Sequence, residues 1–110
     1  MTATMIQASP VVRDKDGWWS HPDIPEFDEG DEAKYRQWVS DQGLTTFYRM
    51  LEDESDEHPA YVSYFDNADP DVSAWNPEPP FGDGWFPLSI HDTEDGPIFV
   101  WATRVPAGAA

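Results

Sequence analysis

Residues 85–103 read WFPLSIHDTEDGPIFVWAT, and this stretch decides the fold. Both of its ends are rich in aromatic and β-branched residues, which favour strands. Between them, Asp95-Gly96 supplies the positive φ that a tight hairpin loop needs. The stretch therefore predicts a β-hairpin with strands from Trp85 to Ile90 and from Ile98 to Thr103, joined by a loop from His91 to Pro97.

The segment before the hairpin predicts a helix followed by a strand. The helix is expected between Asp31, a residue type that caps helix N-termini, and Gly43, a residue type that ends helices. Its apolar stripe, at helical spacing, consists of Tyr35, Trp38 and Val39. Leu44 to Leu51 follows directly and is β-branched and aromatic, which predicts a strand.

Three shorter segments complete the expected elements. Met5 to Val12 alternates loosely in polarity and predicts a first strand. Trp18-Trp19 follows the turn signal Asp16-Gly17 and predicts a short return strand. Pro59 can begin a short helix that extends through Phe65.

These elements predict an α+β fold: a small antiparallel sheet of about four strands, one main helix packed on it, and a C-terminal β-hairpin. The length predicts a single domain over residues 1–110. We expect the ordered part to run from about 5 to 104, with a frayed tail from Pro106 to Ala110. Trp75, in a proline-rich segment, is expected to pin that segment to the sheet.

The charge narrows the class of protein. The chain has 22 Asp and Glu against 6 Lys and Arg, a formal charge of −16, and it also carries six Trp, six Phe and four Tyr. A disordered acidic tail would be poor in aromatic residues, so the composition indicates a folded acidic domain. Such a field repels nucleic acid directly and attracts basic partners.

The composition also bears on the compartment. No cysteine is present, which excludes disulfides, thiolate nucleophiles and cysteine-based zinc sites. No apolar run approaches the roughly 20 residues of a membrane span, so no membrane partner is expected. Met1 to Gln7 lacks the features of a signal peptide, and we therefore expect a cytoplasmic protein in a bacterial host cell.

The carboxylates concentrate between Asp23 and Glu57, where 12 acidic residues occur. Double-stranded DNA carries one negative charge per about 1.7 Å of axis, and carboxylates on a strand, a helix rim and loops can imitate such a track. We predict a surface that binds a basic, nucleic-acid-binding protein, with an exposed indole as apolar anchor. The predicted partner-binding residues are Asp28, Glu29, Asp31, Glu32, Glu52, Asp53, Glu54, Asp56, Glu57 and Trp18.

Two alternatives remain open at this point. In the first, the charge serves only solubility, and the chain is a structural or regulatory module that works through its hairpin. In the second, His91, Asp92 and Asp95 form the site of a small metal-dependent enzyme. Sequence neighbours on a strand point to opposite faces, which argues against the metal site. We therefore expect no enzyme activity, no bound metal and no cofactor.

Two further histidines, His21 and His58, each precede a proline in an acidic loop. This context predicts that both lie at the surface, where their carboxylate neighbours favour the protonated form.

The stretch from Gly84 to Pro97, GWFPLSIHDTEDGP, with Val100-Trp101 after it, resembles a group of small acidic proteins encoded by phages and prophages of Gram-negative bacteria. The lead-in from Pro59 to Pro80 shares the resemblance, which covers roughly Ile6 to Arg104. It carries over no catalytic residue. It implies a phage accessory gene acting in a bacterial cytoplasm, in keeping with a DNA mimic or anti-defence inhibitor.

Overall fold

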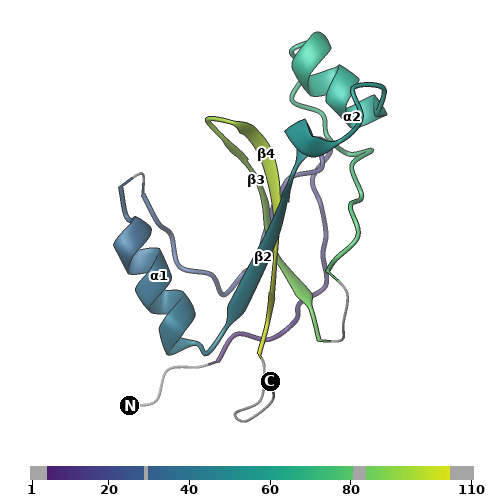
Figure 1. The fold of residues 1–110 in the computed structure, drawn as a ribbon. Coiled ribbons are helices and arrows are strands. Elements are labelled where there is room, and N and C mark those ends of the chain that lie inside the picture. The colour runs from purple at the N-terminus through teal and green to yellow at the C-terminus, as the bar shows by residue number, and fades with distance from the viewer. Residues whose placement is uncertain (1–4, 29, 81–83, 105–110) are drawn as a thin grey trace.

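The computed structural model describes residues 5–28, 30–80 and 84–104. Its centre is one antiparallel sheet of four strands in the order β1-β3-β4-β2 (Figure 1). The strands are β1 (Trp19–Ser20), β2 (Thr45–Met50), β3 (Phe86–Thr93) and β4 (Gly96–Thr103). The α+β class and the C-terminal hairpin are confirmed.

The hairpin of β3 and β4 is longer than predicted. Thr93 pairs with Gly96, so the turn consists only of Glu94-Asp95, and most of the expected loop is strand. The Thr93 hydroxyl donates to the Gly96 carbonyl at 2.7 Å and accepts from the Asp95 N–H at 3.1 Å. Gly96 has φ +102° and lies against Phe65, so the position requires glycine both for its backbone and for space.

The main helix, α1 (Glu32–Asp41), and the strand after it are confirmed. Asp31 occupies the N-cap position, but its side chain does not cap the helix. It accepts instead from the Asp28 N–H at 2.9 Å, which closes the preceding loop. No residue of α1 is fully buried, so the helix packs only loosely beside the sheet.

The predicted first strand, Met5 to Val12, is wrong. The described part of this segment is extended chain outside the sheet, and the edge position beside β3 is taken by Trp19–Ser20. Ile6 alone enters the core; its N–H donates to the Gln42 side-chain oxygen at 2.8 Å. Val11 and Val12 are exposed, so the loose alternation did not correspond to a buried face.

Apolar side chains cover both faces of the sheet. One face contributes Ile90, Phe99 and Trp101, which pack with Leu51, Ala60, Val72 and Trp75. The other contributes Phe86, Leu88, Val100 and Ala102, which pack with Ile6 and Leu44. Trp75 is fully buried, and its ring packs edge-on against Phe99 with 6.0 Å between the ring centroids. The prediction that Trp75 pins its segment to the sheet is confirmed.

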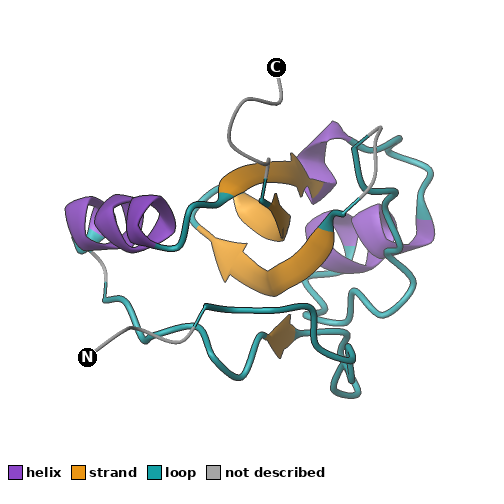
Figure 2. Ribbon diagram, turned by 90° about the horizontal axis from the view of Figure 1, so that it is seen from below, coloured by secondary structure: helices purple, strands orange, loops and turns teal. Residues whose placement is uncertain are grey.

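The helical segments lie on opposite sides of this sheet. Figure 2 shows α1 on one side and, on the other, α2 (Pro59–Tyr61) with its continuation as a single π-helical turn (Val62–Asp66). A short 3-10 helix (Leu51–Asp53) follows β2. The radius of gyration is 15.0 Å, whereas a compact domain of this length is expected near 13 Å.

Candidate functional site

The first determinant of the surface charge is where the basic side chains lie. Arg13 donates to three backbone carbonyls, those of Gly17 at 2.7 Å, Trp75 at 2.8 Å and Val72 at 3.0 Å. It also donates to the Asn76 side chain at 3.0 Å. Burial of the guanidinium lowers the pKa of Arg13, while the charge of Asp14 opposes that effect. Arg13 therefore links two loops through backbone hydrogen bonds, and among the described residues its guanidinium forms no ion pair.

A second guanidinium acts in the same way at the other end of the sheet. Arg104 donates to the Ile6 carbonyl, to the Gln42 carbonyl at 2.8 Å and to the Gln42 side chain at 3.0 Å. Arg49 donates to the Glu78 carbonyl at 2.7 Å. Three of the six basic residues thus donate to backbone carbonyls, and none of these three forms an ion pair with a carboxylate among the described residues.

Within the described ranges, two ion pairs are found. Lys34 lies 3.5 Å from Asp31, and Arg36 lies 3.5 Å from Glu32. Exposed pairs of this kind contribute little to stability. The net charge therefore acts as unbalanced self-repulsion in the folded state.

We expect added sodium chloride to raise the melting temperature, because screening weakens repulsion between carboxylates over distances beyond about 8–10 Å. Thermal unfolding followed by circular dichroism at constant pH, from low to moderate ionic strength, measures the shift. A melting temperature that falls with salt would contradict the idea that repulsion outweighs the few attractive pairs.

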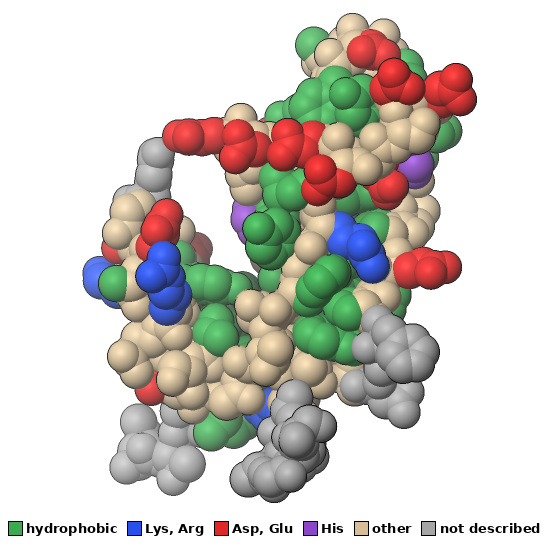
Figure 3. Space-filling model, viewed as in Figure 1, with side chains coloured by type: hydrophobic (Ala, Val, Ile, Leu, Met, Phe, Trp, Pro, Cys, Tyr) green, Lys and Arg blue, Asp and Glu red, His purple; other side chains and the backbone are tan. Residues whose placement is uncertain are grey.

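The predicted carboxylates after β2 lie on the 3-10 helix and on the segment that leads into α2. Glu52, Asp53, Asp56 and Glu57 are exposed, and no side-chain hydrogen bond or ion pair of theirs is found among the described residues. Figure 3 shows acidic side chains gathered across the upper part of the molecular face that it draws. Glu54 differs, because its carboxylate accepts from the Trp75 indole N–H at 2.9 Å. Glu54 therefore satisfies the indole of a buried core residue.

The second predicted group lies at the start of α1. Asp28 and Glu32 are exposed, and Asp31 is half-buried and engaged with the Asp28 N–H and with Lys34. Glu29 lies outside the described residues. The structure thus places two predicted groups of carboxylates at the ends of different elements, one beside α1 and the other after β2.

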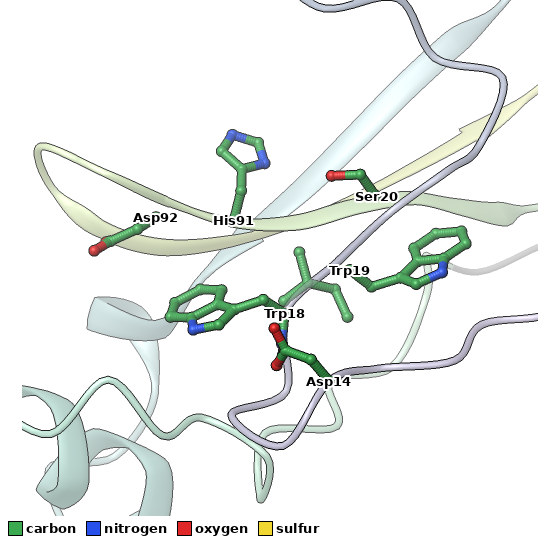
Figure 4. A pocket seen from close by; sticks show the side chains of 7 residues that line it. Asp14, Trp18, Trp19, Ser20, His91 and Asp92 are labelled. Carbon is green, nitrogen blue, oxygen red and sulfur yellow. The ribbon is translucent and has the colours of Figure 1, made fainter.

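Trp18, the predicted apolar anchor, is half-buried against the core. Its backbone N–H donates to the Asp14 carboxylate at 3.0 Å, and its indole lines a small open cavity of about 360 Å³ beside β3. Figure 4 shows Trp18 and Asp14 on one side of the hairpin. Part of the indole therefore remains available to a partner, but Trp18 stands apart from the carboxylates after β2 in sequence and in element.

The proposed metal-binding residues of the hairpin separate. His91 and Asp92 point to opposite sides of β3, as expected for neighbours on a strand (Figure 4). Asp92 accepts from the Tyr64 hydroxyl at 2.8 and 2.9 Å, which raises the pKa of Tyr64. Desolvation lowers the pKa of His91, against the opposing charge of Asp92. In the part of the chain that the structure describes, no three His, Asp or Glu side chains gather to hold a metal ion.

The prediction that His21 is a surface residue is wrong. Its side chain is buried; Nδ1 accepts from the Asp23 N–H at 3.0 Å, and Nε2 contacts the Gln7 carbonyl at 2.5 Å. The half-buried His58 accepts from the Ala60 N–H at 3.1 Å and so caps α2. Both imidazoles accept a hydrogen bond from the backbone N–H two residues further along the chain. The neighbouring prolines and carboxylates in the sequence did not indicate these bonds.

A groove beside α1 was not indicated by the sequence. A groove of about 930 Å³ lies between the sheet and the segment from Ser20 to Tyr35, and Figure 3 shows a hollow between α1 and the sheet. Its floor carries Tyr48, Ile98 and Val100 from β2 and β4. Its acidic lining consists of Glu26, Asp28, Asp31 and Glu32. The groove thus combines an apolar floor with a negative rim.

Comparison of the chain with protein-family models, with curated proteins and with solved structures found no match. The resemblance to phage and prophage proteins therefore stays a prediction from the sequence. No helix among residues 5–28, 30–80 and 84–104 has the length and apolar character needed to cross a membrane.

Proposed function

We propose that this chain is a non-enzymatic acidic protein that binds a basic, nucleic-acid-binding partner protein. The observation that carries the proposal is the contrast between four exposed carboxylates after β2, without ion pairs among the described residues, and the guanidinium groups of Arg13, Arg49 and Arg104, which are directed to backbone carbonyls. A folded protein that needed charge only for solubility would have no reason to concentrate it in this way.

The most concrete form of the proposal is a mimic of nucleic acid, acting as an anti-defence inhibitor for a phage in a bacterial cytoplasm. Carboxylates on the 3-10 helix and on the turn before α2 offer a basic channel a substitute for phosphates. Complementary charge of this kind accelerates association, and the acceleration falls steeply as ionic strength rises. Binding that is fast and sensitive to salt is therefore expected.

The test is capture of partners from a bacterial lysate on immobilised protein, followed by elution in a salt gradient and mass spectrometry. We expect one basic nucleic-acid-binding protein to elute late from the wild type. The variant Glu52→Gln/Asp53→Asn/Asp56→Asn/Glu57→Gln should lose it, because the four exposed charges are removed. Glu54 is left intact, since its carboxylate supports Trp75.

A matched control removes four exposed carboxylates elsewhere: Asp66→Asn/Glu78→Gln/Glu94→Gln/Asp95→Asn. Both variants lose the same charge, so a site-specific contact predicts loss only in the first. Retention by the first variant with loss in the control would contradict the proposal and favour a module that works through its hairpin. Equal, partial weakening of both would indicate a diffuse charge effect without a defined site.

A further inference from the structure

The groove beside α1 has the features of a specific contact site. Its floor is formed by β2 and β4 on the sheet face toward α1, and Tyr48, at 59% exposure, is one of the most exposed large apolar side chains described. Ile98 is half-buried and Val100 is buried beside it. An exposed aromatic ring on a rigid strand, next to two aliphatic side chains, is an apolar contact surface.

The wall opposite this floor is held in place by aromatic packing. The centroid of the Phe27 ring lies 5.4 Å from that of Tyr35, in an edge-on arrangement, and 6.1 Å from that of Trp38. Tyr35 stacks on Trp38 with 6.3 Å between the ring centroids. This cluster joins α1 to the loop before it, so the helix keeps its position although none of its residues is fully buried. The groove is therefore a built feature of the fold.

The rim of the groove is acidic, and most of its charge is available. Glu26 and Asp28 are exposed and their carboxylates make no hydrogen bond or ion pair with other described residues. Glu32 has only an exposed pair with Arg36 at 3.5 Å. Among the groove-lining residues, the structure includes no Lys or Arg. A cationic occupant thus gains chiefly from Glu26 and Asp28, whereas Asp31 and Glu32 already pair with Lys34 and Arg36, and an anionic occupant is repelled.

We propose that this groove binds a short basic segment of the partner protein, with one or two apolar side chains set on the floor and Lys or Arg on both flanks. A volume near 930 Å³ lies at the upper end of the roughly 300–1,000 Å³ of ligand pockets, which is room for a few side chains. The inference rests on the proposed function and deepens it. It gives the contact an apolar component that a pure phosphate mimic lacks.

Two labelled synthetic peptides test the inference. One has two central Leu with two Arg on each side, and the other replaces the two Leu by Ser at the same charge. Fluorescence anisotropy at moderate salt measures both affinities, and NMR of the 12.5 kDa protein locates the contact. We expect the Leu peptide to bind about tenfold more tightly, a ratio equivalent to about 1.4 kcal/mol, and to shift the amide signals of β2 and β4 at the groove.

The variants separate this inference from the proposed function. Tyr48→Arg places a cation on an exposed floor position and should abolish the preference for the Leu peptide, whereas Tyr48→Phe should retain it. Glu26→Gln/Asp28→Asn should weaken both peptides. Equal binding of the two peptides, unaffected by Tyr48→Arg yet reduced by neutralising Glu52, Asp53, Asp56 and Glu57, would overturn the groove and leave the acidic surface standing. Binding of neither peptide would overturn the groove as well.

Discussion

Trp75→Ala is expected to lower the free energy of unfolding by about 3–5 kcal/mol, the range for removing a buried large aromatic side chain. Trp75 is fully buried in the cluster that contains Leu51, Phe99 and Trp101. The substitution leaves a cavity there, and it also removes the indole N–H that the Glu54 carboxylate accepts. Urea unfolding followed by the fluorescence of the remaining tryptophans gives the free energy.

Two controls divide this loss into its parts. Trp75→Phe keeps most of the apolar volume but removes the donor to Glu54, so it should cost clearly less than alanine. Glu54→Gln keeps an acceptor oxygen and should cost less still. A loss below about 1 kcal/mol for Trp75→Ala would mean that the cluster around Phe99 does not depend on this ring.

Arg13→Ala is expected to cost about 3 kcal/mol, because hydrogen bonds from a charged donor are worth roughly 1.5–3 kcal/mol each and are not additive here. The guanidinium holds the carbonyls of Gly17, Val72 and Trp75, which lie on two segments far apart in the chain. Without it, the Gly17 and Trp75 carbonyls lose the Arg13 donor, and the two segments keep only the backbone bond from the Val72 N–H to the Asp16 carbonyl at 2.7 Å. The same urea titration measures the effect.

Arg49→Ala is the matched control for Arg13. Arg49 makes one exposed hydrogen bond to the Glu78 carbonyl and lies 5.2 Å from the centre of the Phe47 ring, so its removal should cost about 1 kcal/mol while changing the net charge by the same amount. Arg13→Lys keeps the charge but not the planar fork, and it should recover little of the stability. Equal costs for Arg13→Ala and Arg49→Ala would contradict a clamping role.

The elements that depend on local sequence were predicted well. The hairpin follows from Asp95-Gly96 between two apolar runs, and α1 follows from its helical spacing and the glycine at its end. The strand from Met5 to Val12 was wrong, because a loose alternation does not show whether a strand has a neighbour to pair with. The length of the hairpin was underestimated, since the Thr93 side chain closes the turn and so allows the strands to continue to Glu94-Asp95.

The sequence predicted the exposed carboxylates of the candidate site but not the groove beside α1. Acid-rich runs identify exposed carboxylates such as Glu52 and Asp56, because so many like charges favour solvent. The sequence did not separate them from Glu54, whose role depends on a tryptophan 21 residues further along the chain. Nor did it indicate the groove, whose floor and wall come from elements that meet only in the folded protein.

The sequence by itself determined the strong negative charge, the α+β class and the hairpin, because each of these depends on composition or on neighbours within a few residues. Only the tertiary structure decided which groups the arginine side chains contact and that acidic residues line a groove with an apolar floor. Arg13 reaches Trp75 across 62 positions, and Arg104 reaches Ile6 across 98. Such contacts form when distant segments are brought together by burial of the two apolar faces of the sheet, a process that no local pattern records.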